Sequence, residues 1–192
     1  MWNTPNLLTL LRIILIPVYV GVFYIPSPWA HFTCALVFSV AALTDWLDGY
    51  LARRWEQTSS LGAFLDPVAD KLMVAVALVL LVQADPRAVL ALPAAVIIGR
   101  EITVSALREW MAELGARARV AVSKVGKLKT TAQMVAIILL ILADVDSSIY
   151  DLGMVLLYVA AALTIWSMML YLRAAWPSLT SQNAALNGDD RR

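Results

Sequence analysis

Six apolar stretches, each close to the length that crosses a lipid bilayer, dominate the chain. They cover residues 7–24, 29–55, 62–83, 89–110, 127–143 and 152–172. A membrane-spanning helix needs about 20 mostly apolar residues. Hydrophobic residues make up 61% of the 192 residues and charged residues 15%, whereas soluble domains have roughly 45–50% and 25%. The sequence therefore predicts an all-α membrane protein with six transmembrane helices in an up-and-down bundle.

Both ends of the chain carry further signals. The first apolar stretch opens with Pro-Asn-Leu-Leu-Thr at 5–9 and contains Arg12, so we expect its first turns to form a short N-terminal interfacial helix. The start has no basic segment and no small-residue cleavage site follows it, so no signal peptide is expected. Residues 1–176 are predicted to form one membrane domain and residues 177–192 a polar C-terminal tail. The one cysteine, Cys34, lies in an apolar run and is expected to pack in the core.

The polar parts of four stretches fall at alternating ends. They cover residues 44–54, 62–71, 100–113 and 123–133. Turn residues make the connections short, so the helices alternate in direction and these four parts meet at one membrane face. Most basic residues lie on that side and Arg87 alone lies on the other. The excess of Lys and Arg on cytoplasmic loops then predicts a polar cavity that faces the cytoplasm, with both termini on the same side.

Four aspartates lie close together in this apolar sequence: Asp45, Asp48, Asp66 and Asp70. Spacings of three and four residues put each pair on one face of a helix. Four neighbouring carboxylates repel one another unless a cation lies between them. Their hard oxygen ligands suit Mg²⁺, Mn²⁺ or Ca²⁺. The alternative is a set of ion pairs with the nearby cations Arg53, Arg54 and Lys71.

A second group of polar residues is basic. Its members are Arg100, Arg108, Lys124, Lys127 and Lys129. For Lys129 the expected role is contact with anionic lipid head groups. Arg100 follows Gly99 inside an apolar helix, where Glu101 and Glu109 are able to neutralise Arg100 and Arg108. The other interpretation is a pocket for a phosphate, which guanidinium groups bind well. Metal-binding carboxylates beside such a pocket indicate phosphoryl-group chemistry.

The motif Asp45-x2-Asp48-Gly49-x2-Ala52-Arg53-x8-Gly62-x3-Asp66-x3-Asp70 resembles the complete signature of the CDP-alcohol phosphotransferases. The stretches Pro5-Asn6-Leu7-Leu8-Thr9-x2-Arg12, 99–109 and 123–130 resemble a bacterial branch of this family. The resemblance covers most of the chain from Asn6 to about Leu172. It implies a six-helix membrane bundle in the bacterial inner membrane, usually as a homodimer.

The resemblance also implies a reaction and residue roles. The family transfers a phosphatidyl group from CDP-diacylglycerol to an alcohol, here sn-glycerol 3-phosphate, and uses two divalent ions, Mg²⁺ or Mn²⁺. Asp45, Asp48 and Asp66 then correspond to metal ligands, and Asp70 to the general base, which also touches metal. The residues that correspond to the CDP site are Asn6, Thr9, Gly49, Ala52 and Arg53. Those expected to bind the acceptor phosphate are Arg100, Arg108, Lys124 and Lys127.

Three other interpretations remain at this point. The same chemistry with another acceptor (serine, inositol phosphate or a second phosphatidylglycerol) is the nearest, because the aspartate motif does not distinguish acceptors. A divalent-cation transporter is the second, since aspartates in membrane helices also line ion paths. An inert scaffold is the third and leaves the four aspartates unexplained. Nothing in the sequence indicates a nucleic-acid partner.

Overall fold

Six helices and no strand form the part of the chain that the structure, a computed structural model, describes. That part is residues 4–55, 60–113 and 124–189, with the side chains of residues 7–45, 47, 65–107, 109–112 and 128–173. The helices are α1 (Thr4–Phe23), α2 (Ala30–Trp55), α3 (Ser60–Ala84), α4 (Ala88–Glu113), α5 (Lys124–Leu142) and α6 (Ser148–Asp189). Each apolar stretch of the sequence forms one helix, which confirms the all-α fold.

The structure differs from the sequence-based expectation at the start of the chain. From Thr4 onward the first helix is continuous, so the described residues contain no separate interfacial helix before it. Pro5 stands in the first turn, where a missing N–H breaks no helical hydrogen bond. At the other end α6 runs to Asp189, through most of the expected polar tail. Pro177 lies inside this helix, and Gly188 stands near its end, where glycine commonly terminates helices.

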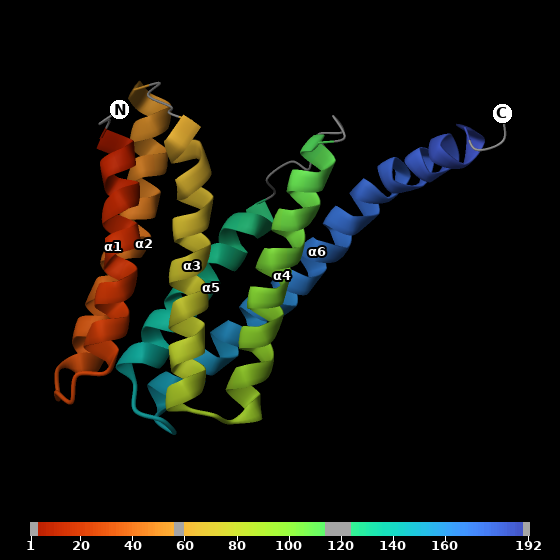
Figure 1. The fold of residues 1–192 in the computed structure, drawn as a ribbon. Helices are drawn as coiled ribbons and strands as arrows, with labels where there is room; N and C mark the ends of the chain where they lie inside the picture. The colour runs from red at the N-terminus through yellow and green to blue at the C-terminus, as the bar shows by residue number, and fades with distance from the viewer. Residues whose placement is uncertain (1–3, 56–59, 114–123, 190–192) are drawn as a thin grey trace.

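The helices pack in two groups that share a core. In Figure 1, α1, α2 and α3 lie together, and α6 runs obliquely across the bundle. The closest packing is of α5 on α6 and of α1 on α2, followed by α1 on α3 and α4 on α6. The largest side chains with almost no exposed surface include Tyr19, Phe38, Leu78, Ile137 and Leu157. These side chains come from α1, α2, α3, α5 and α6, so one core joins both groups.

Large apolar side chains also cover the outside of the bundle. Trp29 is 71% exposed, Leu43 and Ile102 are 65% exposed, and Leu92 is 64% exposed. Within the described residues, Ala88–Ala112 and Ser148–Arg173 are long and apolar enough to cross a membrane. An apolar exterior of this extent is typical of surfaces that lipid or protein covers.

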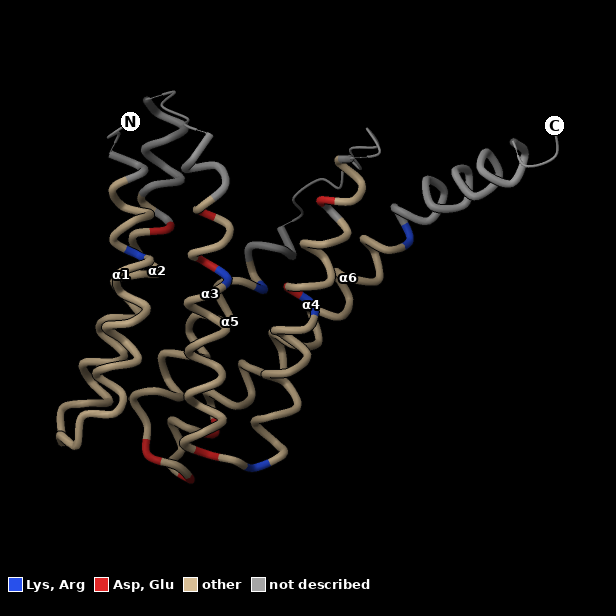
Figure 2. Tube along the Cα trace, viewed as in Figure 1, with Lys and Arg blue, Asp and Glu red and all other residues tan. Residues whose placement is uncertain are grey.

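Charged residues lie in two bands at opposite ends of the bundle (Figure 2). One band holds Arg12, Asp45, Asp66, Asp70 and residues of α4 and α5. The other holds the connections that follow α3 and α5. The segments between them, 13–44, 72–84, 88–99, 130–143 and 152–172, contain no Asp, Glu, Lys or Arg. The alternation of the helices therefore brings the polar parts of α2, α3, α4 and α5 to one end, as the sequence predicts.

The opposite band contains an ionic clasp between two connections. Arg87 donates to Asp85 through Nε at 2.7 Å and Nη2 at 2.9 Å, and to Asp146 through Nη1 at 2.8 Å. The Tyr150 hydroxyl also donates to Asp85, and the Arg87 guanidinium lies 5.8 Å from the Tyr150 ring centre. Asp146 has a φ of 71°, which Asp tolerates better than most residues. The clasp ties the α3–α4 connection to the start of α6.

We expect this clasp to make stability depend on pH. The hydrogen bonds from Arg87 lower the pKa of the Asp85 carboxyl, so the unfolded chain binds the proton more tightly than the folded one. The clasp then stabilises the fold fully above the ordinary aspartate pKa of about 3.9, and its contribution is lost as the pH falls through the lower folded value. The measurement is Tm in detergent between about pH 3 and pH 7. Asp85→Asn should lower Tm at neutral pH, and Tm of this variant should change less than that of the unchanged protein as the pH falls.

Asp144→Asn is the matched control, because Asp144 lies beside Asp146 in the α5–α6 connection and its side chain is outside the clasp. Its curve should follow that of the unchanged protein. An Asp85→Asn curve that also follows the unchanged protein over the whole range would show that the clasp contributes nothing to stability.

Candidate active site

Helix α1 binds two of the aspartates. Arg12 donates from Nη1 to Asp45 Oδ1 on α2 at 2.8 Å, and the Thr9 hydroxyl donates to Asp66 on α3. The Arg12 side chain is 1% exposed, whereas that of Asp45 is 42% exposed. A buried guanidinium requires a charged partner, so the position of Asp45 is fixed from the protein side while its outer surface remains accessible.

Asp70 lies one helical turn beyond Asp66 on α3. It lines a narrow crevice of about 10 Å³ together with Arg12, Phe38, Met73 and Met134, which is room for about one water molecule. Arg12, which binds Asp45, lines this crevice together with Asp70. The three described aspartates and Arg12 therefore form one aspartate cluster, with the arginine at its buried side.

Several residues of the expected site lie outside the described side chains. They are Asn6, Asp48, Gly49, Ala52, Arg53, Arg108, Lys124 and Lys127. The described side chains contain no group of three or more acidic, histidine or cysteine residues positioned to hold a metal. Within that part of the chain, hydrogen bonds and ion pairs use one oxygen of Asp45 and one of Asp66. The remaining oxygens suit a hard cation, so the donor chemistry fits a divalent ion and the metal site stays a prediction.

The partners of these aspartates differ from those that sequence reasoning considered. Lys71, one of the three cations named for them, bonds to the Ser105 hydroxyl instead. Thr9, which was expected at the CDP site, donates a hydrogen bond to Asp66. The main partner is Arg12, for which sequence reasoning gave no role in the site. The signal for it was present, because Arg12 is the one charged residue in the stretch 7–24, and such residues in membrane helices usually mark functional sites.

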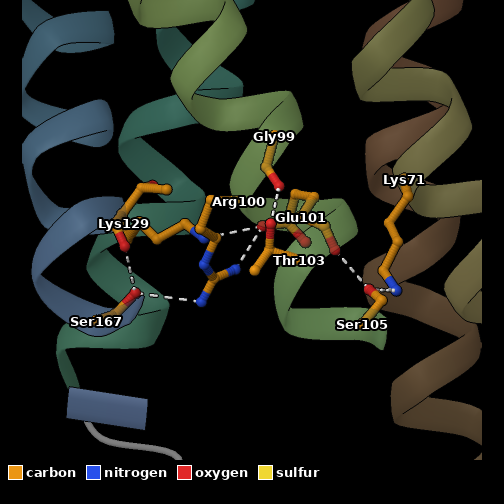
Figure 3. A network of polar contacts seen from close by, with 9 residues as sticks. Lys71, Gly99, Arg100, Glu101, Thr103, Ser105, Lys129 and Ser167 are labelled. Carbon is orange, nitrogen blue, oxygen red and sulfur yellow. Dashed lines mark hydrogen bonds and ion pairs between the residues drawn. The ribbon is translucent and has the colours of Figure 1, made fainter. Parts of the chain in front are cut away.

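A second polar cluster joins α4, α5 and α6 (Figure 3). Glu101 Oε1 accepts hydrogen bonds from Arg100 Nη1 at 2.6 Å and from Lys129 Nζ at 3.0 Å. Arg100 Nη2 donates to Ser167 Oγ at 3.2 Å. We call Arg100, Glu101, Lys129 and Ser167 the cation cluster. Glu101 thus neutralises Arg100, which was one of the two interpretations of this arginine.

The expectation that Lys129 contacts lipid head groups is wrong. Lys129 is 6% exposed and faces α4, because its position on α5 points into the bundle. Sequence reasoning also missed Ser105 and Ser167. Both serines bond to a cation on another helix. The two partners lie far apart in the sequence, so no spacing pattern reveals the bond.

Hydrogen bonds connect the two clusters. Lys71, the residue after Asp70, donates to Ser105 Oγ, and that hydroxyl donates to the Glu101 carbonyl oxygen at 2.5 Å. Figure 3 shows Lys71 and Ser105 bridging the gap from α3 to α4. Carboxylates suited to a metal ion therefore lie beside cations suited to a phosphate, at the same end of the bundle.

Comparison with known proteins agrees with this combination of fold and site. The sequence profile of the CDP-alcohol phosphatidyltransferases matches residues 2–166, and the chain belongs to this family. A relative from Escherichia coli (strain K12) is 56% identical over 94% of this chain and 99% of its own length. One from Sodalis glossinidius (strain morsitans) is 57% identical over 90% of this chain and 94% of its own length. Both are named CDP-diacylglycerol–glycerol-3-phosphate 3-phosphatidyltransferase, which is the bacterial phosphatidylglycerophosphate synthase branch that the sequence motifs resemble.

Proposed function

We propose that this chain transfers the phosphatidyl group of CDP-diacylglycerol to sn-glycerol 3-phosphate, giving phosphatidylglycerophosphate and CMP. The observation that carries the proposal is the aspartate cluster beside the cation cluster. The first suits a metal-bound pyrophosphate and the second suits the phosphate of the acceptor. Similarity along almost the full length to relatives with this name supports the choice of acceptor.

Divalent metal ions belong to this proposal, since the CDP-alcohol phosphatidyltransferases generally depend on them. Asp45, Asp48, Asp66 and Asp70 would hold two ions, Mg²⁺ or Mn²⁺. When bound, the ions neutralise the pyrophosphate and stabilise the negative charge of the departing CMP. Arg12 supports the set from the protein side by fixing one Asp45 oxygen.

The chain's own residues supply positioning and proton transfer. Arg100, Arg108, Lys124 and Lys127 bind the acceptor phosphate, which directs the free primary hydroxyl toward Asp70. Asp70 takes the hydroxyl proton as general base. The acceptor oxygen forms a bond to the phosphatidyl phosphorus, and the bond from that phosphorus to the oxygen of CMP breaks. Asn6, Thr9, Gly49, Ala52 and Arg53 bind the CDP part, where the small residues let the ligand approach the backbone.

We further propose that all six helices span the bacterial cytoplasmic membrane, with the site and both termini on the cytoplasmic side, and that the chain forms a homodimer. The apolar exterior and the two charged bands support the orientation. To test the topology, a reporter that is active only in the cytoplasm is fused after Arg192, and we expect it to be active. Activity of a reporter that works only in the periplasm would refute this topology.

To test the dimer, the mass of the protein is measured in a native lipid nanodisc. A mass that corresponds to one copy of the chain would refute the dimer.

The decisive experiment is a CMP-release assay on detergent-purified protein with CDP-diacylglycerol and Mg²⁺. The acceptors to compare are sn-glycerol 3-phosphate, serine, inositol phosphate and phosphatidylglycerol. We expect release with sn-glycerol 3-phosphate well above that with the other three. Release with one of the others alone would keep the fold and the aspartate site but overturn the acceptor. No release with any acceptor would overturn the proposed reaction.

Transport of divalent cations is disfavoured by the distribution of charge. The uncharged segments between the two bands (Figure 2) offer an ion no carboxylate on its way across, whereas ion paths through membranes are lined by polar or charged groups. Metal flux into sealed vesicles that contain the purified protein would contradict this conclusion.

A further inference from the structure

Glu101 occupies the groups that the acceptor's phosphate needs. A single oxygen of its carboxylate, Oε1, bridges Arg100 on α4 and Lys129 on α5 (Figure 3). The side chains of Arg100 and Lys129 are 14% and 7% exposed. An arginine and a lysine that converge on one oxygen are arranged as they would be around a phosphate oxygen.

The cation cluster has more donor capacity than Glu101 uses. Among the described contacts, Arg100 and Lys129 share a single oxygen of one carboxylate. Arg100 Nε is buried and has no hydrogen-bond partner among the described residues. A buried donor without an acceptor is unfavourable. A phosphate has more oxygens and more negative charge than the carboxylate and would satisfy this guanidinium better.

Glu101 also has space to move away. Its side chain is 26% exposed and lines a groove of about 410 Å³ between α3 and α4, together with Lys71, Ser105 and Glu109. The groove offers the carboxylate space beside the ammonium group of Lys71, although most of its other lining residues are apolar. The groove also reaches Lys71, the neighbour of Asp70, so the released carboxylate stays beside the reaction site.

We propose that Glu101 is a displaceable counter-ion: it holds Arg100 and Lys129 in place until a phosphate group replaces it, and Lys129 is then a phosphate-binding residue. The identification of that phosphate with the acceptor's rests on the proposed function. One consequence is selectivity. The phosphate of an acceptor carries up to two negative charges and can replace Glu101 between the two cations. Serine has only one negatively charged group, its carboxylate, and therefore replaces Glu101 less well.

The test uses Glu101→Gln and inorganic phosphate as the probe. The first readout is Tm of the full-length protein in detergent, with phosphate and with chloride at equal ionic strength. Without phosphate, the variant should unfold at a lower temperature, because Arg100 and Lys129 lose the charged carboxylate that bridges them. Phosphate should raise Tm more in the variant than in the unchanged protein. An equal increase in both would overturn the proposal and leave Glu101 as a structural ion-pair partner.

The second readout is steady-state kinetics. In Glu101→Gln the KM for sn-glycerol 3-phosphate should fall about tenfold, since the acceptor no longer competes with a charged hydrogen bond. The KM for CDP-diacylglycerol should not change. An unchanged or higher KM for the acceptor would contradict displacement of Glu101.

A second variant tests Lys129. Lys129→Met should reduce the phosphate-dependent increase in Tm, and an undiminished increase would show that Lys129 does not bind the phosphate.

Two further variants complete the design. Asp151→Asn is the control, because Asp151 lies in the first turn of α6, outside the cation cluster and the groove, so both readouts should stay unchanged. Glu101→Asp keeps the charge on a shorter side chain, so the increase of Tm with phosphate should be intermediate. This variant replaces Glu101→Gln in the test if Glu101→Gln does not fold. If the unchanged protein uses only a phosphate-free acceptor, the proposed function fails while the Tm result still decides the anion site.

Discussion

Replacing Asp70 with Asn should reduce kcat for CMP release by about a thousandfold, within the range for loss of a general base. Asn has nearly the shape of Asp and retains one oxygen, but it cannot accept the hydroxyl proton. Asp70 lines the crevice beside Arg12, so the substitution changes little in packing. The measurement is kcat for CMP release at saturating CDP-diacylglycerol and sn-glycerol 3-phosphate, with Tm measured alongside to confirm that the protein is folded.

A metal titration separates the two roles that Asp70 is expected to have. Asp66→Asn removes charge from an expected ligand, so its activity should recover in part as Mg²⁺ is raised. Asp70→Asn should not recover, because metal does not restore the proton acceptor. Recovery of Asp70→Asn at high Mg²⁺ would make Asp70 a ligand and not the base. Asp151→Asn, at the exposed opposite end of the bundle, is the control and should leave kcat unchanged.

The sequence was sufficient for the helices and for the end at which the polar residues gather. A run of about 20 apolar residues has few solutions other than a helix that buries its own backbone polar groups. Short connections then fix alternating directions, which places residues 62–71 of α3 beside residues 44–54 of α2. Both conclusions depend on segment length and order, and these are read directly from the chain.

The sequence did not determine which side chains meet between helices. One residue step turns a helix by about 100°, so small differences in rotation decide whether Lys129 faces lipid or Glu101. The pairing of Lys71 with Ser105 and of Arg12 with Asp45 depends on the same rotations. α6 is the other case: it continues to Asp189 through a polar segment with Pro177 and several Ser, Thr and Asn residues, which neither hydropathy nor helix propensity assigns to a helix.

Arg12→Gln should lower the free energy of unfolding by about 3 kcal/mol, the lower end of the range for breaking a buried ion pair. The lower end applies because the Asp45 side chain is 42% exposed and partly solvated, although Arg12 is 1% exposed. Activity should fall as well, since Asp45 loses the contact that fixes one of its oxygens. The measurements are denaturant unfolding in detergent micelles and CMP release at several Mg²⁺ concentrations.

A double-mutant cycle with Asp45→Asn isolates the ion pair from the other effects of each substitution. Each single change removes one side of this ion pair, and Asp45→Asn takes a carboxylate away from a guanidinium that is 1% exposed. The double variant removes both charges, so it should be more stable than the sum of the single losses predicts, by at least about 1 kcal/mol. Strictly additive losses would show that the 2.8 Å contact contributes nothing to stability. Arg173→Gln, an exposed arginine on α6, should leave both stability and CMP release unchanged.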